Sequence, residues 1–162
     1  MIVNKAYRYR LYPTREQKMM FAKTFGCVRF IYNKMLSDRI DYYKETGQKL
    51  NNTPAQYKEE FPWLKEVDSL ALANAQMNLN KAYSHFWNDS QHFGKPRFKS
   101  KKNSRASYST NNQKGSVRIE GHKVKLPKVG WVKLCQHRPL PENSIIKTVT
   151  ISKTPSGKYY IS

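Results

Sequence analysis

Acidic side chains are scarce in this chain, and the shortage is concentrated in its second half. Asp and Glu number 11 against 30 Lys and Arg, so the formal net charge at pH 7 is +19. Residues 91–162 hold 16 cations and two acids, which gives +14, whereas residues 1–90 hold 14 cations and nine acids, which gives +5. A positive field of this size concentrates polyanions at a protein surface, so nucleic acid is the first partner to consider.

Composition alone leaves other interpretations of this charge open. A ribosome-like or generally soluble basic protein would carry the same cations facing water. A membrane surface fits less well, because the cations are spread through strand-like and loop-like sequence instead of lying on the polar face of an amphipathic helix. The choice between these classes of protein depends on which motifs and surfaces of the protein carry the cations.

Long apolar runs and paired cysteines are also missing. No stretch approaches the roughly 18 apolar residues of a membrane span, and residues 1–5 lack the apolar region of a secretory signal, so we expect a cytoplasmic protein without a membrane partner. Cys27 and Cys135 lie far apart and neither belongs to a CxxC pair, which argues against a disulfide framework or a complete zinc ribbon. Cys135 and His137 offer two metal ligands at most.

The 11 acids do not form a recognisable catalytic set. Two-metal cleavage of a phosphodiester needs several carboxylates that converge on the ions. Asp38, Asp41 and Glu45 alternate with cations in a predicted helix, where ion pairs between neighbouring turns are the ordinary explanation. Glu59 and Glu60 lie in a predicted surface segment. We therefore expect neither catalytic residues nor a metal site in this chain.

The first part of the chain predicts a strand followed by a long helix. Residues 3–12 alternate between two faces, which is typical of a strand. Thr14 and Gln17 have the spacing of a capping box, which begins a helix after the strand. Apolar residues then recur at helical spacing, and Gly47 can end the helix.

A second long helix is predicted after a loop. The loop has room for a short helical turn near residues 55–60. Asp68 or Ser69 can cap the following helix, whose apolar residues recur at helical spacing as far as Trp87. We expect the two long helices to pack as an antiparallel pair.

After Gly94 the pattern changes to short alternating segments separated by turn residues, which predict a small antiparallel sheet or barrel. The expected fold class is therefore α+β: a small antiparallel β-barrel, wedge-like or OB-like, that a helical lobe interrupts after the first strand. The predicted division is the first barrel strand at 1–13, the helical lobe at 14–92 and the rest of the barrel at 93–162. The predicted later strands span 107–110, 116–119, 123–126, 131–134, 145–152 and 158–161.

The basic run Gly94–Lys102 contains five cations, one aromatic ring and no acid. It marks the return of the chain from the helical lobe to the barrel, where Gly94 and Pro96 can shape a turn. We expect Phe98 to anchor this turn against the core. The cations of the run should then line the seam where nucleic acid meets this half of the protein.

Four motifs resemble successive N-terminal motifs of the OrfB/TnpB family, in the same order and with similar spacing. They are Tyr9-Arg10-Leu11-Tyr12-Pro13-Thr14, Arg29-Phe30-Ile31-Tyr32-Asn33, Gly94-Lys95-Pro96-Arg97-Phe98-Lys99 and Lys125-Leu126-Pro127-Lys128-Val129-Gly130-Trp131-Val132-Lys133. Members of this family are transposon-encoded proteins, described as transposases and understood as RNA-guided DNA nucleases related to type V CRISPR effectors. The resemblance runs from Met1 to about Ser162.

The resemblance implies a wedge-type barrel with an inserted recognition lobe, in the cytoplasm or nucleoid of a prokaryote. It implies guide RNA and double-stranded target DNA as partners, together with a RuvC-like nuclease domain that comes next in the family. A divalent metal site and a zinc ribbon would belong to that later part, so no cofactor is expected in this chain. None of the nuclease residues can be placed on this sequence.

The resemblance also suggests which residues contact nucleic acid. Base or motif reading is expected from polar residues on the recognition lobe and barrel, namely Asn4, Asn52, Ser69, Asn74, Thr110 and Asn111. Stacking on unpaired bases is expected of Phe98 and Tyr108, which lie among cations and polar residues. Phosphate contacts are expected from Arg8, Arg10, Arg29, Lys95, Arg97, Lys99, Lys101, Lys102, Arg105, Lys125, Lys128 and Lys133.

The leading hypothesis is thus a nucleic-acid-binding N-terminal portion of a TnpB-like transposon protein. It would bind guide RNA and recognise a short motif in target duplex DNA, with no nuclease chemistry of its own. Three alternatives stay open: the first part of a complete nuclease, a stand-alone DNA-binding regulator, and a non-functional remnant of a truncated transposase gene.

Overall fold

The computed structural model describes residues 2–102 and 105–162; Met1, Asn103 and Ser104, which fall within the predicted ranges 1–13 and 93–162, lie outside the described residues. The helices are α1 (Arg15–Thr46) and α2 (Ser69–Asn88), with two 3-10 turns between them, η1 (Pro54–Tyr57) and η2 (Pro62–Glu66). The strands are β1 (Tyr9–Tyr12), β2 (Ala106–Asn111), β3 (Arg118–Glu120), β4 (Lys123–Leu126), β5 (Gly130–Cys135), β6 (Thr148–Lys153) and β7 (Tyr159–Ile161).

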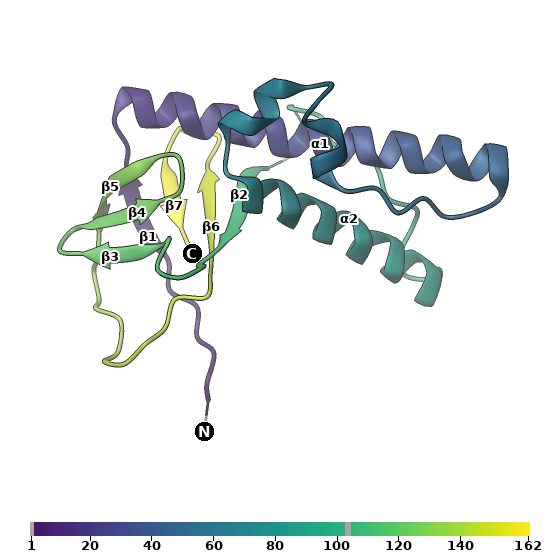
Figure 1. Cartoon of the computed structure of the whole chain (residues 1–162). Coiled ribbons are helices and arrows are strands. Elements are labelled where there is room, and N and C mark those ends of the chain that lie inside the picture. Colours follow the sequence, from purple (N-terminus) through teal and green to yellow (C-terminus); the bar gives the residue numbers. More distant parts are fainter. Residues whose placement is uncertain (1, 103–104) are drawn as a thin grey trace.

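The seven strands form one antiparallel sheet in the order β2-β6-β7-β1-β5-β4-β3. β1 is first in the sequence, yet it pairs with β5 and β7 in the middle of the sheet. The α+β class and the helical insertion after the first strand are therefore confirmed. Among the described residues, β2 and β3 remain the two unpaired edges, so the predicted closure into a barrel is not confirmed. Figure 1 shows the sheet at one end of the molecule, with α1 extending past it.

The boundaries of α1 follow from local chemistry at its two ends. The Thr14 hydroxyl accepts a hydrogen bond from the Gln17 amide, and the Gln17 side chain accepts one from the Thr14 amide, as the capping box predicts. The Gln17 carboxamide also donates to the Trp131 carbonyl at 2.7 Å, which ties the helix start to β5. At the other end Gly47 has φ +71°, and its amide donates to the Tyr43 carbonyl.

The two long helices run in the same direction, so the predicted antiparallel packing is wrong. Near the sheet, Ala71 at the start of α2 shares a core with Phe25 of α1. Farther out along both helices, the guanidinium of Arg39 lies 5.9 Å from the centre of the Tyr83 ring. Contacts that advance together along both sequences require helices that point the same way.

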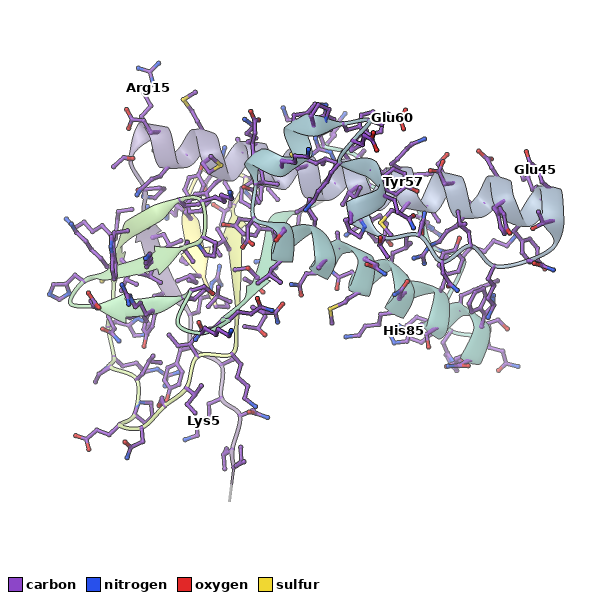
Figure 2. All side chains as sticks on the ribbon, viewed as in Figure 1. Lys5, Arg15, Glu45, Tyr57, Glu60 and His85 are labelled. Carbon is purple, nitrogen blue, oxygen red and sulfur yellow. The ribbon has the colours of Figure 1, made fainter. Side chains whose placement is uncertain are left out.

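The reason is the long connection between the helices. Antiparallel neighbours are typical of short connections, whereas residues 48–68 lead the chain from the far end of α1 back to the sheet before α2 begins. Figure 2 shows the outcome, with Glu45 near the end of α1 and His85 near the end of α2 on the same side of the molecule. The two helices form an arm that projects from the sheet.

The first strand is shorter than the predicted range 3–12. Tyr9 pairs with Ile161 of β7, and Tyr12 pairs with Lys133 of β5, so partner strands are available only along this stretch. Residues 2–8 have no regular secondary structure, although Tyr7 packs against the core. Alternating side chains alone do not make a strand where no neighbouring strand supplies the hydrogen bonds.

Two groups of buried side chains stabilise the fold. One group lies between the sheet and the first turns of α1, where Phe21 contacts rings from β2 and β7, and it includes Ala71 of α2. The other group lies between α1, α2 and the two 3-10 turns, with Leu64 and Leu72 fully buried. The division into ranges 1–13, 14–92 and 93–162 stays a prediction. The first core already draws side chains from all three ranges.

Candidate nucleic-acid interface

A cavity of about 360 Å³ opens between α1, α2, β2 and the end of the basic run. We call it the basic groove. Its floor is formed largely by small and apolar side chains, including Ala22, Ala71 and Ala75. Its lining contains no Asp or Glu but five cations, Arg29, Lys99, Lys101, Arg105 and Lys153. Cations that gather around a concave surface focus a positive potential into it.

Helical spacing brings the walls of the groove together. Ala71, Asn74, Ala75 and Asn78 recur at intervals of three and four on α2, so they share one face of that helix. Arg29 lies on the facing side of α1, seven residues after Ala22. The small alanine side chains leave the space between the helices open, and the side chains of Asn74 and Asn78 line the same space.

The basic run is attached to α1 through Asn33. The Asn33 carboxamide donates a hydrogen bond to the Lys99 carbonyl at 2.7 Å and accepts one from the Lys99 amide at 2.8 Å. The Lys99 ammonium lies 4.2 Å from the centre of the Tyr32 ring. Desolvation against the helix lowers the pKa of Lys99, although part of the residue remains exposed. Two of the family-like motifs, 29–33 and 94–99, therefore meet in the structure.

A second basic surface lies on the outer face of the sheet. Lys123 and Lys133 pair across β4 and β5, and their side chains are exposed. Arg8 lies 4.0 Å over the Tyr160 ring, which keeps its guanidinium on the same face. Arg10 is half-buried, and its Nε atom has no hydrogen-bond partner among the described residues. None of these four cations belongs to the lining of the basic groove.

The structure divides the predicted phosphate contacts into three sets. The groove holds Arg29, Lys99, Lys101 and Arg105. The basic run adds Lys95, Arg97 and Lys102, all exposed. The sheet and its turns hold Arg8, Arg10, Lys125, Lys128 and Lys133. Sequence reasoning missed Lys153 in the groove. Its place two residues after buried Ile151 in β6 is the signal that puts it on the side of the sheet facing the helices.

Two of the predicted base-reading residues are internal. Asn52 is 2% exposed; it accepts from the Arg39 Nε and donates to the Met35 carbonyl and the Tyr57 hydroxyl. Thr110 is fully buried and donates to Asp68, the residue that caps α2. Their polar groups are used inside the fold, so neither side chain is available to a base edge in this structure.

The other four predicted base-reading residues differ in their surroundings. Asn4 and Ser69 are exposed. Asn74 lines the basic groove and donates to the side chain of Asn111, which in turn donates to Thr148 on β6. These last contacts link α2 to the sheet. Asn78, which sequence reasoning missed, is exposed on the groove one turn beyond Asn74.

The two predicted stacking residues also separate. Tyr108 is 4% exposed and packs among Phe21 and Phe25, and burial raises its pKa. It is a core residue in this structure, which corrects the prediction that it is available to a base. Phe98 is 57% exposed, so the expectation that it anchors the basic run in the core is wrong. Its role in stacking stays a prediction.

Replacement of Asn52 by alanine is expected to lower the free energy of unfolding by about 2–4 kcal/mol, because buried partners would lose their hydrogen bonds. Tyr57, labelled in Figure 2, accepts a hydrogen bond from Asn52 and belongs to the core between α1, α2 and the two 3-10 turns. Desolvation and the hydrogen bond to Asp38 raise the pKa of Tyr57 to about 12. Urea unfolding measures the loss, with the exposed neighbour Asn51→Ala as control. A variant that stays fully stable but changes base preference would contradict this interior role.

The acidic residues in the described part of the chain do not gather into a metal site. No group of three His, Cys, Asp or Glu side chains with suitable placement occurs among residues 2–102 and 105–162. Asp38 pairs with Lys34 one turn earlier and accepts a hydrogen bond from Tyr57. Neither α1 nor α2, nor any other helix of the described chain, is long and apolar enough to cross a membrane.

Comparison of the sequence with known proteins relates this chain to a family. A family profile described as a helix-turn-helix domain of the OrfB/IS605 type matches residues 1–48. A candidate RNA-guided DNA endonuclease of Streptomyces pristinaespiralis is 32% identical over 167 residues, which cover 99% of this chain and 41% of that protein. The chain belongs to the OrfB/TnpB family. In the part of the profile match that the structure describes, this family member has one strand and one continuous helix, not two helices joined by a turn.

Two further relatives show how much of a family protein the chain represents. InsQ of Escherichia coli K12, also named as a candidate RNA-guided DNA endonuclease, is 27% identical over 98% of this chain and 39% of its own length. The virulence protein VsdF of Salmonella dublin is 33% identical over 113 residues, which cover 60% of this chain and 93% of VsdF. The chain thus spans about two fifths of the two OrfB/TnpB endonuclease relatives and nearly all of VsdF.

Proposed function

We propose that this chain is the nucleic-acid-binding N-terminal portion of an OrfB/TnpB protein. It binds guide RNA and recognises a short motif in target duplex DNA, and it performs no nuclease chemistry itself. The observation that carries this proposal is the basic groove, where five cations from α1, from the chain before β2 and from β6 surround one cavity that has no acidic side chain in its lining.

The groove chemistry suits a sugar-phosphate backbone. Arg29 and Arg105 can each donate two parallel hydrogen bonds to a phosphate, while the lysines act as point charges. Asn78 and Ser107 add neutral polar groups to the lining, as base-edge contacts require. Small side chains on the floor leave room for a strand to approach closely.

Two sets of cations on different elements support two ligands. The basic groove lies between the helices and β2, whereas the outer sheet face carries Lys123, Lys133 and Arg8. We assign motif-containing duplex to the groove and guide RNA to the sheet face. The DNA cleavage that the names of the relatives describe, and the divalent metal and zinc that would accompany it, we assign to the part of those proteins that this chain does not span.

The test is a salt titration of binding to a 30-base-pair duplex and to a single-stranded RNA of equal length. With five groove cations in contact with phosphates, the logarithm of the duplex affinity should fall against the logarithm of salt concentration with a slope of about −4 to −5. The slope for RNA should be negative as well, at about −0.7 per contact. If the affinities do not change between about 50 and about 300 mM salt, the electrostatic explanation of binding is wrong.

A stand-alone DNA-binding regulator is a second candidate. The observation in its favour is VsdF, a relative that this chain matches over 93% of its length. A regulator must accumulate by itself in the cell, so a blot of cell lysate should reveal a stable product of this chain alone. A blot without such a product favours the larger OrfB/TnpB protein or a gene remnant.

A further inference from the structure

Asn33 occupies an unusual place for an uncharged side chain. It lies on α1 in the turn after Arg29, and its single carboxamide satisfies both backbone groups of Lys99, 66 residues away. A residue on a neighbouring antiparallel strand makes the same two contacts, because its N–H donates to one backbone carbonyl and its C=O accepts from one backbone amide. Asn33 therefore fixes both the position and the direction of the chain at Lys99.

The direction of the chain at Lys99 determines where the neighbouring cations lie. Lys99 and Lys101 both line the basic groove, and so does Arg29, four residues before Asn33 on the same side of α1. The segment from Gly94 to Ser100 has no regular secondary structure of its own. Without a fixed point, cations on such a segment would have to be ordered when a ligand binds, and that ordering opposes binding.

We propose that Asn33 is a positioning residue for nucleic-acid binding, which holds the backbone at Lys99 so that Lys99 and Lys101 enter the basic groove beside Arg29. This inference rests on the proposed function, since it concerns the cations of the same groove. Asn33 itself contacts no phosphate in this proposal. It acts through the two lysines, and the net charge of the protein does not depend on it.

The first experiment replaces Asn33 with alanine, and with leucine, which keeps most of the volume. Both variants should bind duplex DNA about 10-fold more weakly at 0.1 M salt, and the salt slope should become less negative by about one, because the equivalent of one phosphate contact is lost at constant charge. Asn80→Ala, at an exposed position of α2, is the control and should leave affinity and slope unchanged. Thermal unfolding confirms that each variant is folded at the temperature of the assay.

Trypsin gives a readout that needs no nucleic acid. Release of the segment should accelerate cleavage after Arg97, Lys99 and Lys101 in both Asn33 variants, since mobile, exposed segments are cut first. Cleavage elsewhere in the chain should keep its rate. If cleavage of this segment is as slow as in the unmodified protein, Asn33 does not hold it, and the inference is overturned.

A double-mutant cycle separates positioning from general stability. In a Lys99→Ala, Lys101→Ala background, Asn33→Ala should have no further effect on affinity, because its cations are already gone. An equal tenfold loss in that background would show that Asn33 acts by another route and would overturn the inference. Failure of the proposed function has a different signature: the unmodified protein itself would then show no salt-dependent binding.

Discussion

Replacement of the five groove cations by alanine is expected to weaken binding to duplex DNA by about 10³- to 10⁴-fold at 0.1 M salt. Each phosphate contact contributes about 0.9 to the salt slope, which is roughly eightfold in affinity at this concentration, and not every contact forms at once. The slope should fall by about three to five in magnitude. The replaced residues are Arg29, Lys99, Lys101, Arg105 and Lys153.

A charge-matched variant distinguishes local contacts from the general attraction of a basic protein. It replaces five exposed lysines outside the groove and leaves the predicted phosphate contacts intact, so both variants fall from +19 to +14. The general field weakens equally in both, and a loss of less than about tenfold is expected for the control. Equal losses in the two variants would mean that the groove is not the binding site. The control residues are Lys5, Lys44, Lys65, Lys81 and Lys147.

The elements that sequence predicted well are those determined by neighbouring residues. Thr14 and Gln17 form the capping box within one turn, so the start of α1 needed no tertiary information. Residues 123–126 alternate strictly between lysine and apolar side chains, and β4 has the predicted bounds. Gly47 ends α1 because its backbone adopts a positive φ that other residues resist.

The elements that sequence predicted poorly depend on distant partners. Asn52 and Thr110 are polar residues of types usually found at the surface. Inside the fold they form hydrogen bonds with Arg39 and Asp68, which no local sequence pattern reveals. Tyr108 lies near cations in sequence, yet the sheet turns its ring toward Phe21. Alternation of side chains along a strand indicates that the strand has two faces. It does not indicate which face packs against the core.

The basic groove illustrates the same limit at a larger scale. Its cations come from α1, from residues 99–105 and from β6, so their shared cavity exists only after the sheet and helices have packed. Sequence could name most of these cations individually. It could not group them, and it could not separate them from Lys125 or Lys133 on the other face of the sheet. The grouping is the information that the fold adds.

Replacement of Phe21 by alanine is expected to lower the free energy of unfolding by about 3–5 kcal/mol. Phe21 is fully buried, and its ring centre lies 5.7 Å from that of Tyr159 and 6.3 Å from that of Tyr108. Deletion of this ring opens a cavity where α1, β2 and β7 meet. Urea unfolding measures the loss, and Met19→Ala, 66% exposed on the same helix, should change stability by less than about 0.5 kcal/mol.

Such a loss is a large part of the roughly 5–15 kcal/mol that stabilises an ordinary domain, and it should act on the sheet and the helical arm together. Ala71 brings α2 into the same core as Phe21, so the sheet and the arm should unfold in one shared transition. Fluorescence tests this in two variants, one that keeps only Trp131 in the sheet and one that keeps only Trp87 in the arm. Because both parts form the basic groove, duplex DNA at 100 times its dissociation constant should restore about 2.7 kcal/mol to Phe21→Ala. The same DNA concentration should restore almost nothing to the variant without groove cations, since that variant remains folded but binds too weakly. Separate transitions for the two tryptophans would instead show that the arm folds independently of the sheet, and that the groove forms only when the two parts dock.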